Sequence, residues 1–149
     1  MSQVTFVLLD AKNLDTVKEM KNKIRALFKV GNHSVHINDT HEDTVRIAKT
    51  VFNDNSIHFL NNRKNVSFPN YKKLMGNMKP NENEIITGST VLSLYGLRDC
   101  KDIDKIYYKN PPADSHNQYL ENLYKVTLDN IVNNPIYHLY YNGFKYVAL

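Results

Sequence analysis

Apolar and polar positions follow two different periods over the first part of the chain. Apolar residues at helical spacing predict a helix over Asp15–Phe28. Thr40, with Asp43 three residues later, is a capping-box pattern that predicts the start of a second helix. Three short runs of apolar, β-forming residues predict strands, at Val4–Leu9, Ser34–Asn38 and Ser56–Leu60. The resulting βαβαβ order is typical of a small α/β layer with right-handed crossovers.

The middle of the chain is more polar and separates this pattern from a second one. Residues 61–83 contain two prolines and predict a connection with one short helix around Tyr71–Met78. We therefore expect three parts: a small α/β unit over 1–62, a connecting segment over 63–83 and a second core over 84–149. The pattern leaves open one fused domain over 1–149, and an α+β arrangement in place of α/β.

The last part of the chain predicts strands on either side of a helix, and ends in a hairpin. Its first elements are the strand Glu84–Thr87, the helix Ser89–Leu97 and the strand Asp102–Tyr108. They are followed by the loop Lys109–Asn117, the helix Leu120–Asn133 and the hairpin strands His138–Tyr141 and Phe144–Leu149. Asn142-Gly143 between two apolar-rich runs is a strong local hairpin signal.

Composition limits the class of protein. With 42% hydrophobic and 23% charged residues among 149, the chain can bury a core and is expected to fold. Cys100 is the single cysteine, which excludes an intrachain disulfide and a zinc site built from several cysteines. The N-terminus lacks the basic flank and long apolar run of a signal peptide, and no apolar run is long enough for a membrane helix. We expect a cytoplasmic protein without a membrane partner.

The net charge of +4 favours anionic partners such as nucleotides. A nucleic-acid-binding domain is one interpretation of this charge. It predicts a steep dependence of binding on salt concentration, but it rests on charge alone and ranks last.

A strand that ends in Gly88-Ser89 and continues at once into a helix is the first half of a candidate chemical site. Glycine lets the backbone approach a phosphate closely, and the start of a helix offers free N–H groups. Asp102 and Asp104, two residues apart on the next predicted strand, are expected to project from one face. Two adjacent carboxylates suit Mg²⁺, and Mg²⁺ beside a triphosphate is what nucleotidyl transfer requires.

This combination resembles the signature of the DNA-polymerase-β-like nucleotidyltransferase superfamily, of the small or minimal type. The signature is a hydrophobic residue, Gly-Ser, a spacer of about a helix and a turn, then two aspartates that alternate with hydrophobic residues. Gly88-Ser89, the spacer 90–101 and Asp102-Ile103-Asp104 match this order. Thr87 occupies the first hydrophobic slot, and Lys105 departs from the last one.

The resemblance implies a function and a set of site residues. Asp102 and Asp104 would be the catalytic carboxylates and would bind two Mg²⁺ ions, while Gly88 and Ser89 would hold the triphosphate of a nucleoside triphosphate. Four further runs resemble segments that accompany surface-polysaccharide or sugar-transfer proteins of bacteria and large viruses: HSVHINDTHEDTVRIAK, NDNSIHFLNN, LYGLRDCKDID and YYNGFKY. This second resemblance favours a sugar or sugar phosphate over a polynucleotide end as the acceptor. A protein is also expected as acceptor in preference to nucleic acid.

A third carboxylate, which active members of the superfamily usually supply from a later strand, is missing from the pattern. The predicted strand Phe144–Leu149 contains no acid, and Asp129 lies on a predicted helix. A partner, or residues beyond Leu149, would have to supply this group. The alternative is a nucleotidyltransferase-like module that binds a nucleotide, a sugar nucleotide or a protein partner without turnover. A plain structural interpretation also stays open, with Gly88 as a turn, Ser89 as a helix cap and the aspartates on a solvated face.

A second group of candidate ligands lies between the predicted second strand and the helix that follows. His36 and Asn38 share one face of that strand, and His41 is expected in the first turn of the helix. They are candidates for facing a ligand or for binding a metal, with ordinary capping and surface roles as the alternative. The tyrosines of the hairpin are expected to pack within it, with stacking on bases or sugars as the alternative.

Overall fold

The computed structural model describes residues 4–38 and 40–149 and divides the chain into two compact units, Met1–Ala48 and Lys49–Leu149. The helices of the first part are α1 (Leu14–Phe28) and α2 (His41–Val51), and α2 runs across the boundary. The helices of the second unit are α3 (Asp54–Asn62), α4 (Pro69–Gly76), α5 (Ser89–Leu94) and α6 (Leu128–Asn133). Its strands are β1 (Glu84–Thr87), β2 (Asp104–Tyr107), β3 (His138–Tyr141) and β4 (Phe144–Val147).

The first unit is helical, and the βαβαβ layer predicted for residues 1–62 is wrong. Residues 4–38 and 40–62 form no strand. The run Val4–Leu9, predicted as a buried strand, has no regular structure, and Val4 is 71% exposed. The run Ser34–Asn38 has no neighbouring strand either: Lys21 and Arg25 of α1 donate hydrogen bonds to its carbonyl groups. A β-strand needs a neighbouring strand to form hydrogen bonds with its backbone groups. Among the described residues, Val4–Leu9 and Ser34–Asn38 have no such neighbour, so they do not form strands.

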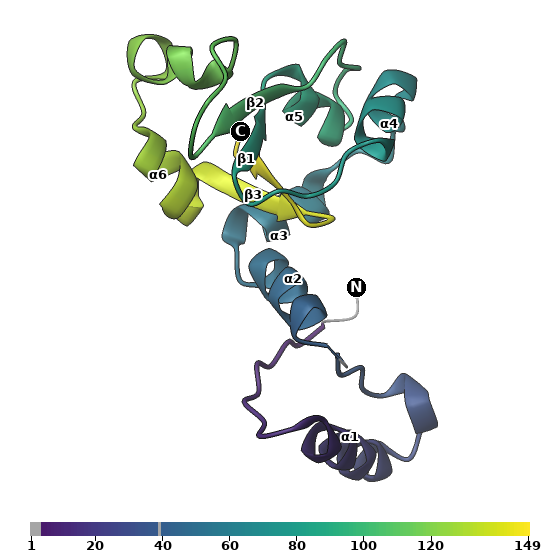
Figure 1. Ribbon diagram of the computed structural model, residues 1–149. Coiled ribbons are helices and arrows are strands. Elements are labelled where there is room, and N and C mark those ends of the chain that lie inside the picture. The colour runs from purple at the N-terminus through teal and green to yellow at the C-terminus, as the bar shows by residue number, and fades with distance from the viewer. Residues whose placement is uncertain (1–3, 39) are drawn as a thin grey trace. The chain divides into compact units, whose positions relative to one another are not determined.

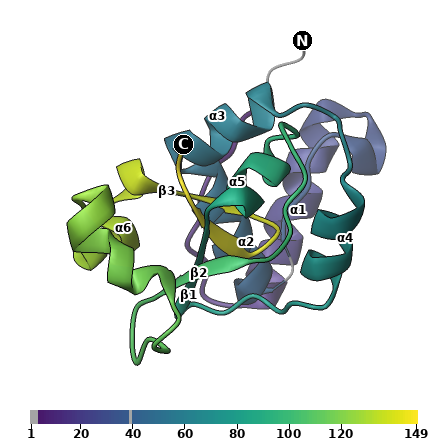
Figure 2. The ribbon, with the colours of Figure 1, turned by 90° about the horizontal axis from the view of Figure 1, so that it is seen from above.

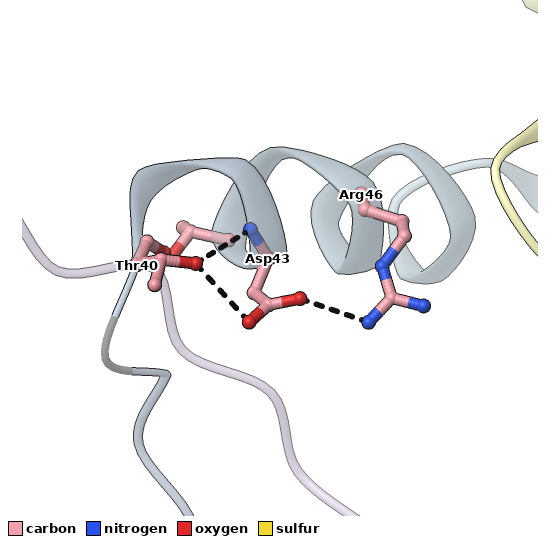
Figure 3. Close-up of polar contacts among 4 residues, drawn as sticks. Thr40, Asp43 and Arg46 are labelled. Atoms are coloured by element: carbon pink, nitrogen blue, oxygen red, sulfur yellow. Dashed lines mark hydrogen bonds and ion pairs between the residues drawn. The ribbon is translucent and has the colours of Figure 1, made fainter. Parts of the chain in front are cut away.

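Both helices predicted in the first unit are confirmed. Asn13 caps α1 by accepting a hydrogen bond from the Thr16 amide at 2.9 Å. At the start of α2, the Asp43 amide donates to the Thr40 hydroxyl at 3.1 Å, and this hydroxyl donates to the Asp43 carboxylate at 3.1 Å (Figure 3). The capping box predicted from Thr40 and Asp43 is therefore present.

The strand predicted at Ser56–Leu60 is instead the helix α3. Asn53, which is only 4% exposed, caps this helix by accepting hydrogen bonds from the amide and the hydroxyl of Ser56. Ser56 and Phe59 are buried, three residues apart, as expected for one face of a helix. The Ser56 hydroxyl also accepts the Tyr140 amide at 2.7 Å, so α3 is joined to β3.

The second unit contains a mixed four-stranded sheet in the order β2-β1-β4-β3. β1 pairs antiparallel with β2 and parallel with β4, and β3 pairs antiparallel with β4. The predicted hairpin is confirmed, with Asn142 and Gly143 at φ values of 50° and 82° in its turn. Positive φ at both central residues is what a two-residue hairpin turn requires.

Each face of the sheet is covered by its own apolar cluster. Ile86 lies in a cluster with residues of α3 and α5, against which side chains of α4 pack. Ile85 lies in a second cluster, which includes Ile131 of α6 and Leu120. Figure 1 and Figure 2 show α4 and α6 on opposite sides of the sheet. The mixed α/β class is confirmed by this sheet and its helices.

Several predicted elements are present but shorter than expected. α5 ends at Leu94, before Gly96 with its φ of 75°, rather than at Leu97. The helix predicted over Leu120–Asn133 is broken: a π-helical turn, Leu120–Tyr124, ends in the left-handed residue Lys125, and α6 starts after Thr127. Among residues 4–38 and 40–149, no helix combines the length and the apolar character needed to cross a bilayer.

Asn53 provides the sharpest stability test of this fold. Its side chain caps α3 and also donates to the His138 carbonyl at 3.2 Å. Asn53→Ala is expected to lower the free energy of unfolding by about 2–3 kcal/mol, because a cap is lost and a buried carbonyl loses a donor. Thr127→Ala, which removes the exposed cap of α6, is the control and should cost only about 1 kcal/mol. Urea titrations followed by circular dichroism measure both, and equal losses would show that the tertiary hydrogen bonds of Asn53 contribute nothing.

Candidate functional site

The first part of the candidate site is the junction between β1 and α5. β1 ends at Thr87, Gly88 has φ 65° and ψ −144°, and Ser89 begins the helix. This backbone conformation strongly favours glycine. Gly88 is the N-cap residue, so Ser89 is not the helix cap.

Asp104 lies directly against Gly88. The antiparallel register of β1 and β2 places Asp104 opposite Thr87. A Cβ atom added to Gly88 would lie 2.2 Å from Asp104 Oδ2. The structure thus brings together the glycine and the second aspartate of the motif, which are separated by a helix and a turn in the chain.

Asp102 lies outside the strand, in contrast to the prediction that β2 begins there. β2 begins at Asp104, and Asp102 is exposed in the preceding turn. The backbone of Asp102 is held by α5, because the buried Thr90 hydroxyl donates to its carbonyl at 3.1 Å. The strand alternation that was expected to align the two carboxylates therefore does not apply to this pair.

His116 is a site residue that sequence reasoning missed. Its Nε2 atom lies 2.9 Å from Asp104 Oδ1, and the two side chains are 24% and 25% exposed. Its other ring nitrogen, Nδ1, is buried without a hydrogen-bond partner among the described residues. The residue lies within the predicted loop Lys109–Asn117, and its only local signal is the polar run Asp114–Asn117.

Asn117 holds the loop that carries His116 against β2. Its side chain accepts a hydrogen bond from the Tyr107 amide at 2.8 Å and donates to the Tyr107 carbonyl at 2.7 Å. Asn83 bonds in the same way to both backbone groups of Lys109. The Asn117 amide takes the place of a neighbouring strand at the open edge of β2, so His116 is carried by a fixed segment.

Lys105 stands where the motif has its last hydrophobic residue, and it forms an ion pair within the sheet. Its ammonium group lies 2.7 Å from Glu84 Oε2, and both side chains are largely shielded from solvent. The pair links β2 to β1 on the face opposite to Asp104. A cation at this position is therefore neutralised within the sheet.

The described residues contain no group of three His, Cys, Asp or Glu side chains arranged to hold a metal. β4, the parallel neighbour of β1, carries Phe-Lys-Tyr-Val and no acid. Binding of Mg²⁺ by Asp102 and Asp104 stays a prediction, based on the general use of one or two carboxylates together with substrate phosphate oxygens to bind this ion.

The second group of candidates, His36, Asn38 and His41, is not on a strand edge. His36 and Asn38 lie in the irregular segment before α2, and His41 is the first residue of that helix. Hydrogen bonds from Arg46, and then from Thr40, lower the pKa of the nearby Asp43 (Figure 3). A ligand-facing role for the three residues stays a prediction.

Comparison with family models, curated proteins and solved structures finds no match to this chain. The resemblance to nucleotidyltransferases therefore stays a prediction from the sequence motif of Gly88, Ser89, Asp102 and Asp104.

Gly88→Ala tests whether the contact between Gly88 and Asp104 is as close as described. The new methyl group would collide with Asp104 Oδ2, and φ is unfavourable for alanine. We expect a loss of about 1–3 kcal/mol in the free energy of unfolding. Gly76→Ala at the end of α4, where no atom lies within 4 Å of the added carbon, should be neutral or stabilising by up to about 1 kcal/mol. Similar effects of the two substitutions in urea denaturation would contradict the geometry.

Proposed function

We propose that Gly88, Ser89, Asp102 and Asp104 form a Mg²⁺-dependent nucleotide site of the nucleotidyltransferase type. The protein would transfer a nucleotidyl group from a nucleoside triphosphate to an acceptor, with a sugar or sugar phosphate as the favoured acceptor class. The observation that carries this proposal is the contact between Gly88 and the Asp104 carboxylate. A phosphate seated on the backbone at Gly88 would lie beside a carboxylate suited to the metal that neutralises it.

Each residue has a chemical task in this proposal. Gly88 has no side chain that would keep a phosphate away, and Ser89 offers a hydroxyl at the same position. Asp104 and the exposed Asp102 would hold Mg²⁺, which stabilises the charge that develops on the phosphates during transfer. His116 would position Asp104, because it occupies Oδ1 and leaves Oδ2 on the side of Gly88.

A second candidate function is nucleotide binding without turnover. The specific observation in its favour is that no three His, Cys, Asp or Glu side chains, among the residues that the structure describes, are arranged to hold a metal ion. β4 also offers no carboxylate to accept the proton of an attacking hydroxyl. Binding and turnover therefore have to be measured separately.

The first test is calorimetric titration of the protein with nucleoside triphosphates and with nucleoside-diphosphate sugars, in the presence and absence of Mg²⁺. Wild type is expected to bind a triphosphate only when Mg²⁺ is present. The double substitution Asp102→Asn and Asp104→Asn should remove that binding and leave the fold intact. Asp114→Asn removes an exposed carboxylate from the neighbouring loop and should have no effect.

Two outcomes of this titration have distinct meanings. Binding that survives the double substitution would contradict the metal assignment. Binding that is lost as expected justifies assays of pyrophosphate release with sugar acceptors. Release would support the transferase, and its absence with intact binding would support the non-catalytic module.

The role of His116 has its own test. His116→Ala removes the partner of Asp104 Oδ1 and is expected to weaken Mg²⁺-dependent triphosphate binding about tenfold, the usual effect of losing a group that orients a metal ligand. His116→Gln keeps a donor of similar reach and should restore part of the affinity. Unchanged or tighter binding by His116→Ala would show that His116 does not position Asp104.

A further inference from the structure

A cavity of about 360 Å³ lies in the second unit, and the candidate site does not account for it. Its lining comes from the segment after α3, from α4 and α5, and from the hairpin of β3 and β4. The volume falls in the range of small-molecule sites.

The charged groups that line the cavity are both cations. Arg63 and Lys72 line it, and no aspartate or glutamate does. Among the described residues, no carboxylate forms an ion pair with either side chain. A lining with two cations and no acid favours an anionic ligand.

Arg63 is held in place by aromatic groups. Its guanidinium donates a hydrogen bond to the Tyr141 hydroxyl at 2.6 Å and lies 5.4 Å from the centre of that ring. It also lies 5.8 Å from the ring centre of Phe59. The remaining N–H groups of the planar Arg63 guanidinium are suited to donate hydrogen bonds to the oxygens of a phosphate.

Tyrosines form much of the remaining wall. The hydroxyl groups of Tyr71 and Tyr146 lie 3.3 Å apart, and Phe144 and Tyr141 also line the cavity. Burial raises the pKa of both Tyr71 and Tyr146, so their hydroxyls stay neutral near physiological pH. Neutral hydroxyls and aromatic rings beside cations favour a ring that carries an anionic group.

Hydrogen bonds fix the segments that carry the two cations. The Lys64 amide donates to the Tyr95 carbonyl at 3.1 Å, which holds the segment after Arg63 to the end of α5. The Asp99 carboxylate accepts the amides of Asn70 and Tyr71, at 3.2 and 3.0 Å, and so anchors the start of α4. These hydrogen bonds fix the cavity wall in the unliganded protein, which lowers the entropy cost of ligand binding.

The cavity and the Asp104 site lie on opposite faces of the sheet. Asp104 shares a face of β2 with Ile106, which belongs to the cluster of Ile85. Tyr146 lines the cavity and belongs to the cluster of Ile86 on the other face. A ligand in the cavity would therefore not reach the carboxylates of the first site.

We propose that this cavity is a second ligand site, which takes a small molecule with a phosphate monoester on a ring. Arg63 and Lys72 bind the phosphate, and the tyrosine-lined wall contacts the ring. The site does not depend on nucleotide binding at Gly88 and Asp104.

The test uses phenyl phosphate, glucose 1-phosphate and inorganic phosphate as probes, with calorimetry for affinity and two-dimensional NMR for location. Both ring phosphates are expected to bind more tightly than inorganic phosphate and to shift amides that line the cavity, such as those of Ser67 and Asn142. Tighter binding of phenyl phosphate would indicate that the ligand carries an aromatic ring. Tighter binding of glucose 1-phosphate would indicate a sugar ring. Tighter or equal binding of inorganic phosphate would overturn the ring specificity.

Substitutions separate this proposal from the first site and from surface charge. Arg63→Gln should weaken phenyl phosphate binding at least about tenfold, whereas Arg98→Gln, on a residue outside the cavity, should not. Asp104→Asn should leave the affinity for phenyl phosphate unchanged, whether or not it abolishes nucleotide binding. Equal effects of Arg63→Gln and Arg98→Gln, or loss of binding with Asp104→Asn, would overturn the proposal.

A second pair of variants covers the case in which Arg63→Gln disturbs folding. Lys72→Gln removes an exposed cation that lines the cavity, and Lys73→Gln removes its neighbour on α4, which does not. Weaker binding is expected for Lys72→Gln alone. Identical binding by the two lysine variants would contradict the role of Lys72.

Discussion

The double pairing of β1 is the constraint on which the second unit depends. Ile85 pairs with Ile106 of β2 on one side and with Lys145 of β4 on the other. Ile85 and Ile86 point to opposite faces and are each only 1% exposed. A strand that is apolar on both faces has to be covered twice, which is why α3, α4 and α5 pack on one face and α6 with the preceding turn on the other.

The same constraint locates both proposed sites. The antiparallel register of β1 and β2 brings Asp104 to the end of β1, where Gly88 turns the chain into α5. The parallel pairing with β4 brings Tyr146 under the other face, beside the cavity. Strand pairing thus brings together the two ends of the stretch 88–104 at the first site, and it gathers residues between 63 and 146 around the cavity.

Local signals predicted the second half of the chain better than the first. The hairpin turn at Asn142-Gly143 and the junction at Gly88 need particular backbone angles, which these residue types reveal. The run Ser56–Leu60 suits a strand or a helix by its pattern, and the tertiary hydrogen bonds of the Asn53 cap favour the helix. His116 was not predicted because its contact with Asp104 depends on Asn117 clamping the loop to the strand edge, which no local spacing encodes.

α5 is the element that the two proposed sites share, and its packing favours their independence. It begins beside Gly88 and ends with Ser93 and Leu94 at the cavity. Beneath it, the Thr90 hydroxyl is bonded to the Asp102 carbonyl, and the Ser93 hydroxyl donates to the Arg98 carbonyl at 2.7 Å. Both hydroxyl-bearing residues are buried, so moving the helix would break hydrogen bonds that water does not replace. These two hydrogen bonds hold α5 to the segment that follows it, which favours independent binding at the two proposed sites.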